Sequence, residues 1–225
     1  MTFPNQDSSF APVCRIVVLV GILLTAACAV GTPPLSESDS ALVETLGYDA
    51  AVMTRVRGQG KSFERLQGLS EDYRQYPADG LVLFVKPNRG RAVLGRIRGL
   101  LEDSDYSAYL YEQAFGFGPD EIAIVRGDNA LTFLTTVGTN GVNYNVMRED
   151  VLARYKVWDD KYGLNLEGAG LDWLEATFEN PPDDWLVFAK EVYRFCPDVV
   201  DQGAGDVGAL ALELRKGNGV YLWWD

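Results

Sequence analysis

Residues 164–195 read LNLEGAGLDWLEATFENPPDDWLVFAKEVYRF, and they join the two kinds of element that decide the fold. The segments LNLEGAG and DWLEATFE predict a β-hairpin. A helix is predicted to follow, because Asn180 can cap it and Pro181 suits its first position. Asp183 and Asp184 would lie in the first turn, where the helix dipole favours acidic side chains. A hairpin followed by a helix favours an α+β fold.

The rest of the chain repeats this mixed order. The apolar and alternating runs predict strands at 81–85, 107–113, 121–125 and 220–224. Helical patterns predict helices at 87–102, 148–162 and 206–216. Residues 129–137 are expected to form a helix that Asp128 would cap, with a strand as the alternative because Thr, Phe and Val favour strands. We therefore expect an α+β fold with a mostly antiparallel sheet packed with helices, as a single compact domain after a signal and a tether. The last strand, VYLWW, is expected inside the sheet because it is too apolar for an exposed edge.

The N-terminal residues 1–28 have the features of an export signal. Arg15 precedes an apolar run over 16–30, which is shorter than the roughly 20 residues of a membrane-spanning helix. The segment LLTAAC resembles a bacterial lipobox, in which Cys28 would become the lipidated first residue of the mature protein. We expect an exported envelope lipoprotein with a lipid anchor in the membrane. The alternatives are a cleaved secreted protein and an uncleaved anchor or misplaced start.

Residues 29–75 are expected to form a tether followed by a poorly defined helical region. The stretch GTPPLSESDS lacks an apolar period, and residues 57–68 are rich in glycine and basic side chains. The α+β domain is then expected over 76–225.

The charge balance restricts the partners. A net charge of −12 argues against binding to nucleic acid or to anionic lipid surfaces, and it suits a basic protein partner. The sequence contains no histidine, which excludes Ser-His-Asp and Cys-His catalysis and histidine-ligated zinc. We expect no cofactor and no metal. The basic residues between 86 and 98 are expected to form a solvated helix face, with an anion site as the alternative.

Cys196 is the cysteine that remains after the signal, and it raises the question of a reactive thiol. Helical phase places Cys196 on the core face of the preceding helix, and its position at the helix C-terminus does not lower a thiol pKa. A structural role is therefore expected for Cys196, for the helix-ending Pro197, and for Trp223 and Trp224 in the last apolar strand. The tryptophans in the apolar runs are expected in the core, and the alternative is a ligand-stacking surface formed by Trp158, Trp173, Trp185, Trp223 and Trp224.

Asp198 and Asp201 follow Pro197 and are the weak candidates for catalysis. The simpler interpretation is that they cap backbone amides in the turn. The alternatives are oxygen ligation of a hard cation and acid–base catalysis by paired carboxylates.

The chain also resembles a bacterial family, domain of unknown function 4253. The resemblance lies in DGLVLFV, FGFGPDEIAIVRG, GTNGVNYN, WDDKYGL, FAKEVYRFCPDVVDQG and VYLWWD, which together span residues 79–225. The resemblance implies no activity and no catalytic residue.

The amino-acid sequence alone does not assign a specific function. We expect a non-enzymatic binding or accessory lipoprotein tethered to the envelope. The alternatives are an immunity-type protein that neutralises a toxin by surface contact, and a hydrolase that uses carboxylates or a bound cation.

Overall fold

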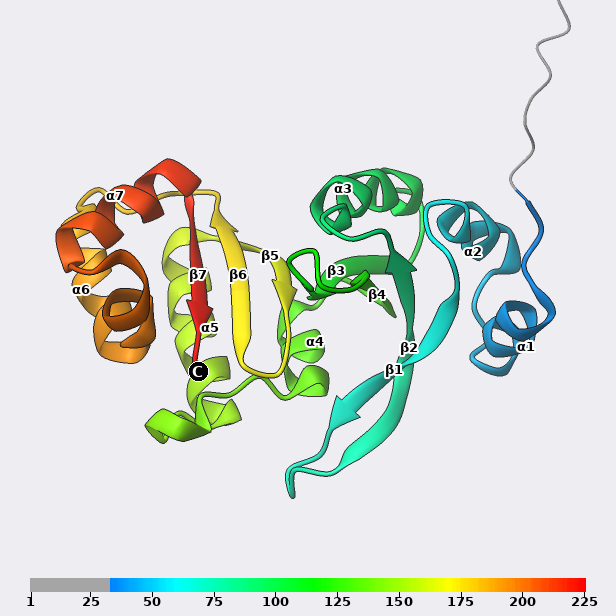
Figure 1. Ribbon diagram of the computed structural model, residues 1–225, viewed down its shortest axis with the longest axis horizontal. Helices are drawn as coiled ribbons and strands as arrows, with labels where there is room; N and C mark the ends of the chain where they lie inside the picture. Colours follow the sequence, from blue (N-terminus) through cyan, green and yellow to red (C-terminus); the bar gives the residue numbers. More distant parts are fainter. Residues whose placement is uncertain (1–32) are drawn as a thin grey trace, which may run out of the picture. The chain divides into compact units, whose positions relative to one another are not determined.

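A computed structural model describes residues 33–225, which form an α+β unit around one seven-stranded sheet (Figure 1). The strands are β1 (Phe63–Leu69), β2 (Gln75–Val85), β3 (Tyr106–Glu112), β4 (Asp120–Arg126), β5 (Leu164–Ala169), β6 (Trp173–Phe178) and β7 (Gly219–Trp223). The helices are α1 (Glu37–Thr45), α2 (Ala50–Arg57), α3 (Gly90–Leu101), α4 (Ala130–Val137), α5 (Arg148–Tyr162), α6 (Trp185–Phe195) and α7 (Val207–Gly217), with a 3₁₀ turn η1 (Val142–Tyr144) and a π-helical turn η2 (Val199–Ala204).

The sheet has the order β1-β2-β4-β3-β5-β6-β7, and five of its pairings are antiparallel. The exception is the junction of β3 and β5, which run parallel and share one registered pair, Leu110 with Gly168. A Cβ atom at position 168 would collide with the Leu110 carbonyl oxygen, so this close approach requires glycine. The predicted α+β class with a mostly antiparallel sheet is confirmed.

The two faces of the sheet carry separate apolar cores. Helices α1, α2 and α3 cover one face over β1 to β4, through buried residues that include Met53 and Ile97. Helices α4 to α7 cover the opposite face, where Trp158 and Phe188 pack edge to face with ring centroids 5.3 Å apart. The α1–α3 face of β6 and β7 carries Trp173 and the partly buried Tyr221 and Trp223.

The N-terminal part of the domain differs from the prediction. Residues 57–68 are not loose: they include the start of β1, which pairs with β2 along its length. Asp39 of α1 is buried, and it accepts hydrogen bonds from the Phe63 backbone N (2.8 Å) and from Arg57 Nε (2.7 Å). These contacts join α1, α2 and β1, so the boundary expected at residue 76 lies inside the compact unit.

Helix α6 begins later than expected. Its N-cap is Asp184, whose carboxylate accepts from Val187 N at 3.0 Å, so the prediction of Asn180 as cap and Pro181 as first residue is wrong. Both residues belong to the connection after β6. Asp184, four residues downstream of Asn180, is an equally good N-cap residue by type, and helix ends are the least certain part of such a prediction.

Strand β7 lies at the edge of the sheet, and the prediction of an interior position is also wrong. The strand is apolar because both of its faces are covered in part. Val220 and Leu222 face the core of α4 to α7. Tyr221 packs between Trp173 and Trp223, with ring centroids at 5.9 and 5.6 Å.

Candidate functional site

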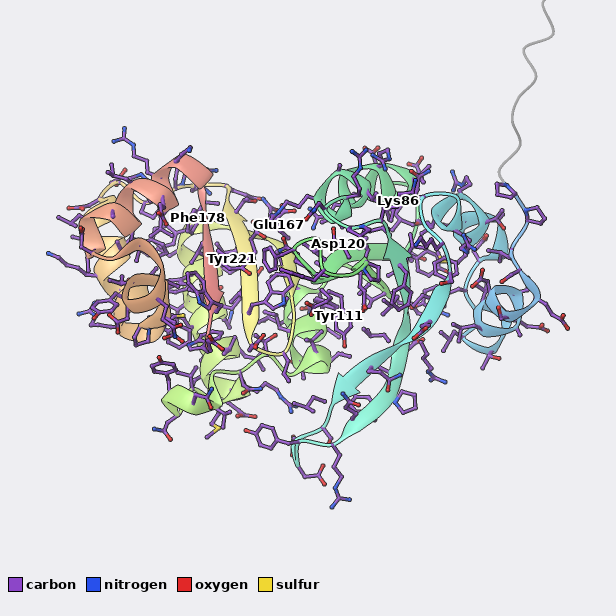
Figure 2. The ribbon with its side chains drawn as sticks, viewed as in Figure 1. Lys86, Tyr111, Asp120, Glu167, Phe178 and Tyr221 are labelled. Atoms are coloured by element: carbon purple, nitrogen blue, oxygen red, sulfur yellow. The ribbon has the colours of Figure 1, made fainter. Side chains whose placement is uncertain are left out.

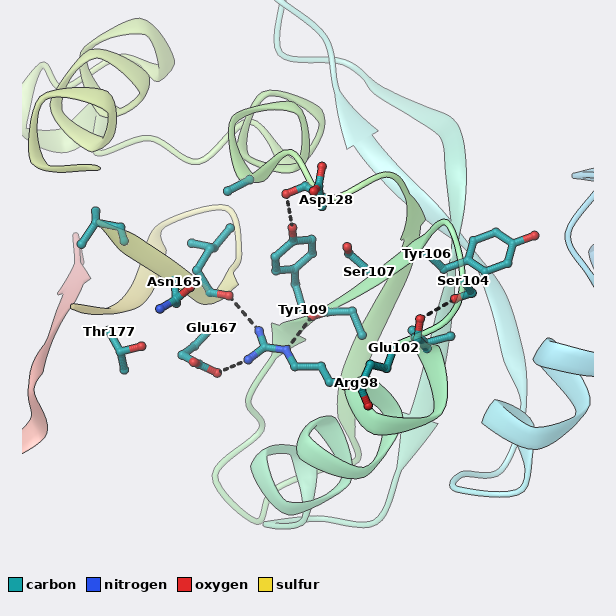
Figure 3. A pocket seen from close by; sticks show the side chains of 15 residues that line it. Arg98, Glu102, Ser104, Tyr106, Ser107, Tyr109, Asp128, Asn165, Glu167 and Thr177 are labelled. Carbon is teal, nitrogen blue, oxygen red and sulfur yellow. Dashed lines mark hydrogen bonds and ion pairs between the residues drawn. The ribbon is translucent and has the colours of Figure 1, made fainter. Parts of the chain in front are cut away.

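The sheet opens into a wedge where β3 and β5 separate (Figure 3). The two strands meet at Leu110 and Gly168, near their carboxyl ends, and diverge toward their amino ends. A cavity of about 630 Å³ lies there, and polar side chains such as Ser107, Asp128 and Asn165 line it.

Arg98 of α3 bridges the wedge. Its guanidinium donates to the Ala108 carbonyl of β3 at 3.2 Å and to the Leu166 carbonyl of β5 at 2.8 Å. It also pairs with the Glu167 carboxylate at 2.7 Å. One side chain thus satisfies backbone acceptors that neighbouring strands would otherwise satisfy directly. Arg98 therefore connects the two halves of the sheet, contrary to the solvated role expected for this basic helix.

A second cavity, of about 500 Å³, lies at the carboxyl ends of β3 and β7. We call it the aromatic pocket. Its lining residues are Glu112, Gln113, Phe115, Asp172, Trp173, Tyr221, Trp223, Trp224 and Asp225. Tyr221, which is labelled in Figure 2, belongs to the edge strand β7. Burial, followed by the charge of Glu175, raises the pKa of Tyr221 to about 12.

The aromatic pocket carries more negative than positive charge. Glu112, Asp172 and Asp225 line it, and its lining residues include no lysine or arginine. Burial raises the pKa of Glu112, and the like charges of Asp172 and Asp120 add to this shift. The nearby Arg91 forms an ion pair with Glu175 instead, with Arg91 Nη1 and Glu175 Oε1 2.5 Å apart. These three carboxylates therefore lack a charged partner within the pocket wall.

A short loop, residues 113–119, forms the lip of the aromatic pocket. Asp120 holds this loop against α3: its carboxylate accepts from the backbone N of Arg89 (2.9 Å), Gly90 (2.8 Å) and Ala114 (3.1 Å). The loop presents Phe115, which is 68% exposed, and Phe117, which is 98% exposed. An anchored loop with two exposed phenylalanines is a feature of interaction surfaces.

Asp198, one of the two predicted catalytic candidates, is buried and fully engaged. Its carboxylate accepts from the Tyr144 hydroxyl, from Gln202 Nε2 (2.9 Å) and from the Asp225 backbone N (2.9 Å). Burial raises the pKa of Asp198, but these hydrogen bonds together outweigh burial and hold the pKa below its ordinary value. Asp198 ties η1, η2 and the end of β7 together.

Asp201 lies apart from this network on η2, and its carboxylate accepts from the Tyr193 hydroxyl at 2.9 Å. The structure therefore does not bring the carboxylates of Asp198 and Asp201 onto one shared partner. Asp225 lines the aromatic pocket, whereas Glu175 accepts from Arg91.

Cys196 is fully buried at the C-cap of α6, and its thiol donates to the Trp223 carbonyl at 2.9 Å. Burial raises the pKa of this thiol to about 12. Pro197 begins the turn after α6, and its carbonyl accepts from the backbone N of Val200 at 2.9 Å. Trp223 lines the aromatic pocket, while Trp224 is buried against Phe195 with ring centroids 5.8 Å apart.

Three residues of the aromatic pocket, Glu112, Asp172 and Tyr221, were not predicted as site residues, and Trp173 was considered for one only as the alternative to core packing. Trp173 and Tyr221 lie in apolar runs that predict core packing. Glu112 lies near the end of the strand predicted at 107–113, and Asp172 begins the second strand of the predicted hairpin, so neither acid stands out in the sequence. The pairing of β6 with β7 places Tyr221 beside Trp173, and the strand order β3-β5-β6-β7 brings Glu112 of β3 to the same cavity. The exposed Phe115 and Phe117 in the glycine-rich segment AFGFGP are the one local signal that could have marked this region.

Cys28 and the rest of the predicted signal and lipobox lie outside the described residues. Between residues 33 and 225, none of the helices combines the length and the apolar character that a membrane crossing demands. The same part of the chain contains no group of three or more acidic, cysteine or histidine side chains placed to hold a metal ion.

The fold and the pocket define an α+β protein with an open, mostly antiparallel sheet and an aromatic, acidic cavity at one end of it. Residues 121–225 match the model of the family described as Domain of unknown function (DUF4253), which confirms the predicted resemblance. The matched span begins in β4, so DGLVLFV lies outside it. It includes β5 to β7, Asp198 and most of the aromatic pocket. No curated protein and no solved structure shows a significant match to the chain.

Proposed function

We propose that this protein is a non-enzymatic binding domain that captures a basic protein partner, and that a lipid on Cys28 tethers it to the bacterial envelope. The observation that carries the proposal is the aromatic pocket, whose lining combines aromatic side chains with three carboxylates that form no ion pair among the described residues. Aromatic side chains are enriched at protein interfaces, and charges opposite to those of the partner add specificity and speed association.

The alternative of a carboxylate-dependent hydrolase has less support. Paired catalytic carboxylates need free oxygens that face a common substrate. Asp198 accepts three hydrogen bonds, and Asp201 accepts from a different hydroxyl. These contacts favour an architectural role for both residues and leave the binding function as the stronger proposal.

The immunity-type function is a narrower form of the same proposal. In it, the basic partner is a toxin that the acidic surface covers. The net charge of −12 supports this form, because long-range attraction accelerates capture of a basic protein.

The binding function is tested with the full-length protein and a model peptide that contains lysine, arginine and leucine. Its control is the same peptide with glutamate in place of every basic residue. We expect binding of the basic peptide at about 0.1 M NaCl and a loss of about tenfold or more at about 1 M, because the screening length falls from about 10 Å to about 3 Å. Equal binding of the two peptides would overturn the proposal.

The tether is tested separately by metabolic labelling with radioactive palmitate. Label is expected in the wild-type protein and is expected to vanish in Cys28→Ser. A wild-type protein that takes up no label would exclude the lipid anchor and leave the binding function untouched.

A further inference from the structure

Three aromatic side chains from β6 and β7 form one wall of the aromatic pocket: Trp173, Tyr221 and Trp223. Trp173 and Tyr221 stack with their rings inclined by 25°, and Trp223 continues this aromatic surface. The volume of about 500 Å³ falls within the range of about 300–1,000 Å³ that is common for binding sites.

The charge around this aromatic surface selects a cation. Aromatic rings attract cations through the negative potential of their faces. Asp172 lies at the end of the turn that leads into Trp173, Glu112 ends β3, and both line the cavity. Arg91 does not neutralise them, because its guanidinium pairs with Glu175 and with Gln113 Oε1 (3.3 Å).

Among cationic side chains, arginine fits these groups best. A guanidinium is planar, so it stacks on tryptophan and tyrosine while its edges donate to carboxylates. An ammonium group is a compact point charge that is strongly hydrated, and it gains less from an extended aromatic wall. The pocket offers both an aromatic surface and several carboxylates.

The lip of the pocket adds an apolar contact beside the cation. Phe115 lines the cavity, and Phe117 projects into solvent from the same anchored loop. Covering such exposed rings removes apolar surface from water, which stabilises a complex. A partner that presents apolar residues next to a basic residue would contact both the pocket and the exposed phenylalanines.

We infer that the aromatic pocket binds an arginine side chain of a protein partner, with Phe115 and Phe117 packing against apolar residues that flank this arginine. The inference rests on the proposed binding function and specifies the chemistry of its site. It assigns Asp172 and Glu112 to the edge of the guanidinium, and the partly buried Tyr221 and Trp223 to its planar face. Trp173 is buried and stacks on Tyr221, so it supports this aromatic surface.

The test uses the full-length protein and the blocked peptide acetyl-Leu-Arg-Leu-amide, followed by NMR of the tryptophan indole N–H signals. The matched ligands are the same peptide with citrulline, which keeps the shape and loses the charge, and with lysine. We expect the arginine peptide to shift the Trp173 and Trp223 signals and to bind about tenfold or more tightly than the citrulline peptide, as loss of a charge-assisted contact predicts. It is also expected to bind more tightly than the lysine peptide.

Two pairs of variants locate the site. Asp172→Asn is expected to weaken arginine binding about tenfold, whereas Glu44→Gln, which removes an exposed charge from α1, is expected to leave it within about twofold. Phe117→Ser is expected to weaken binding, whereas Leu212→Ser, at an exposed position of α7, is not.

Three results would overturn the inference. The first is the absence of any indole shift up to about 10 mM arginine peptide, which lies beyond the millimolar range of a single side chain. The second is equal affinity for the arginine peptide and either matched peptide. The third is equal weakening by Asp172→Asn and Glu44→Gln. If one of these results occurs while the longer basic peptide still binds in a salt-dependent way, the proposed binding function stands and the assignment of arginine to the aromatic pocket is wrong. If no basic peptide binds, the binding function and the assignment of the pocket are both wrong.

Discussion

Replacement of Arg98 by methionine tests whether one side chain holds the two halves of the sheet together. Methionine keeps most of the aliphatic stem and removes the donors to the Ala108 and Leu166 carbonyls. A hydrogen bond from a charged donor contributes about 1.5–3 kcal/mol, but the Arg98 side chain is 35% exposed, so water replaces part of it. We therefore assign about 1 kcal/mol to each carbonyl.

The ion pair with Glu167 adds little, because partly exposed pairs contribute about 0–1 kcal/mol. The expected loss for Arg98→Met is thus about 2–3 kcal/mol in the free energy of unfolding. For a chain of this length each kcal/mol changes the melting temperature by about 2–4 °C, so a decrease of about 4–12 °C is expected.

The assay is urea unfolding followed by tryptophan fluorescence and circular dichroism. The control is Arg96→Met on the same helix, where the guanidinium contacts Gln59 and the Ala92 carbonyl at an exposed position. That variant is expected to change the free energy of unfolding by about 0.5 kcal/mol or less. If Arg98→Met lowers the free energy of unfolding no more than Arg96→Met does, the guanidinium of Arg98 does not hold β3 and β5 together and the prediction is refuted.

Three further predictions concern carboxylates and the thiol. Asp120→Ala removes the acceptor of three backbone amides and is expected to cost about 2 kcal/mol or more in urea unfolding, and a loss below about 0.5 kcal/mol would contradict its role as the anchor of α3. Cys196, with its pKa raised to about 12, is expected to resist a thiol reagent at pH 8 until urea unfolds the protein, and rapid native labelling would show that it is accessible. The folded-state pKa of Asp198 is lowered, so its stabilisation is present above the ordinary aspartate pKa of about 3.9 and is lost as the pH falls through the folded value. Asp198→Asn should therefore be less stable than the wild type at pH 7 and approach it as the pH falls below the folded-state pKa of Asp198, and a difference that does not depend on pH would contradict the assignment.

Local patterns predicted much of the fold because the relevant forces are local. The hairpin of β5 and β6 and the helix α5 follow from alternation, helical spacing and turn residues within short windows. The inward direction of Cys196 likewise follows from the phase of α6. These features depend on a few neighbouring residues and hardly on the rest of the chain.

Features that depend on distant partners were not predictable. The apolar sequence of β7 indicated burial, but only the strand order shows that helices and aromatic neighbours provide it at a sheet edge. The turn after α6 suggested that Asp198 would cap nearby amides. Its partners Tyr144 and Asp225 are instead 54 and 27 residues away along the chain. The aromatic pocket was missed for the same reason, since its residues come from separate segments.

The single registered pair between β3 and β5 also has a consequence for the order of folding. The hairpins β1–β2 and β5–β6 join residues close in the chain, whereas the junction joins residues 110 and 168. Contacts between distant residues carry a larger loop-closure cost, so the junction is expected to form after the rate-limiting step. Arg98→Met should then accelerate unfolding and leave the refolding rate nearly unchanged, which makes this wedge a determinant of how long the native state persists.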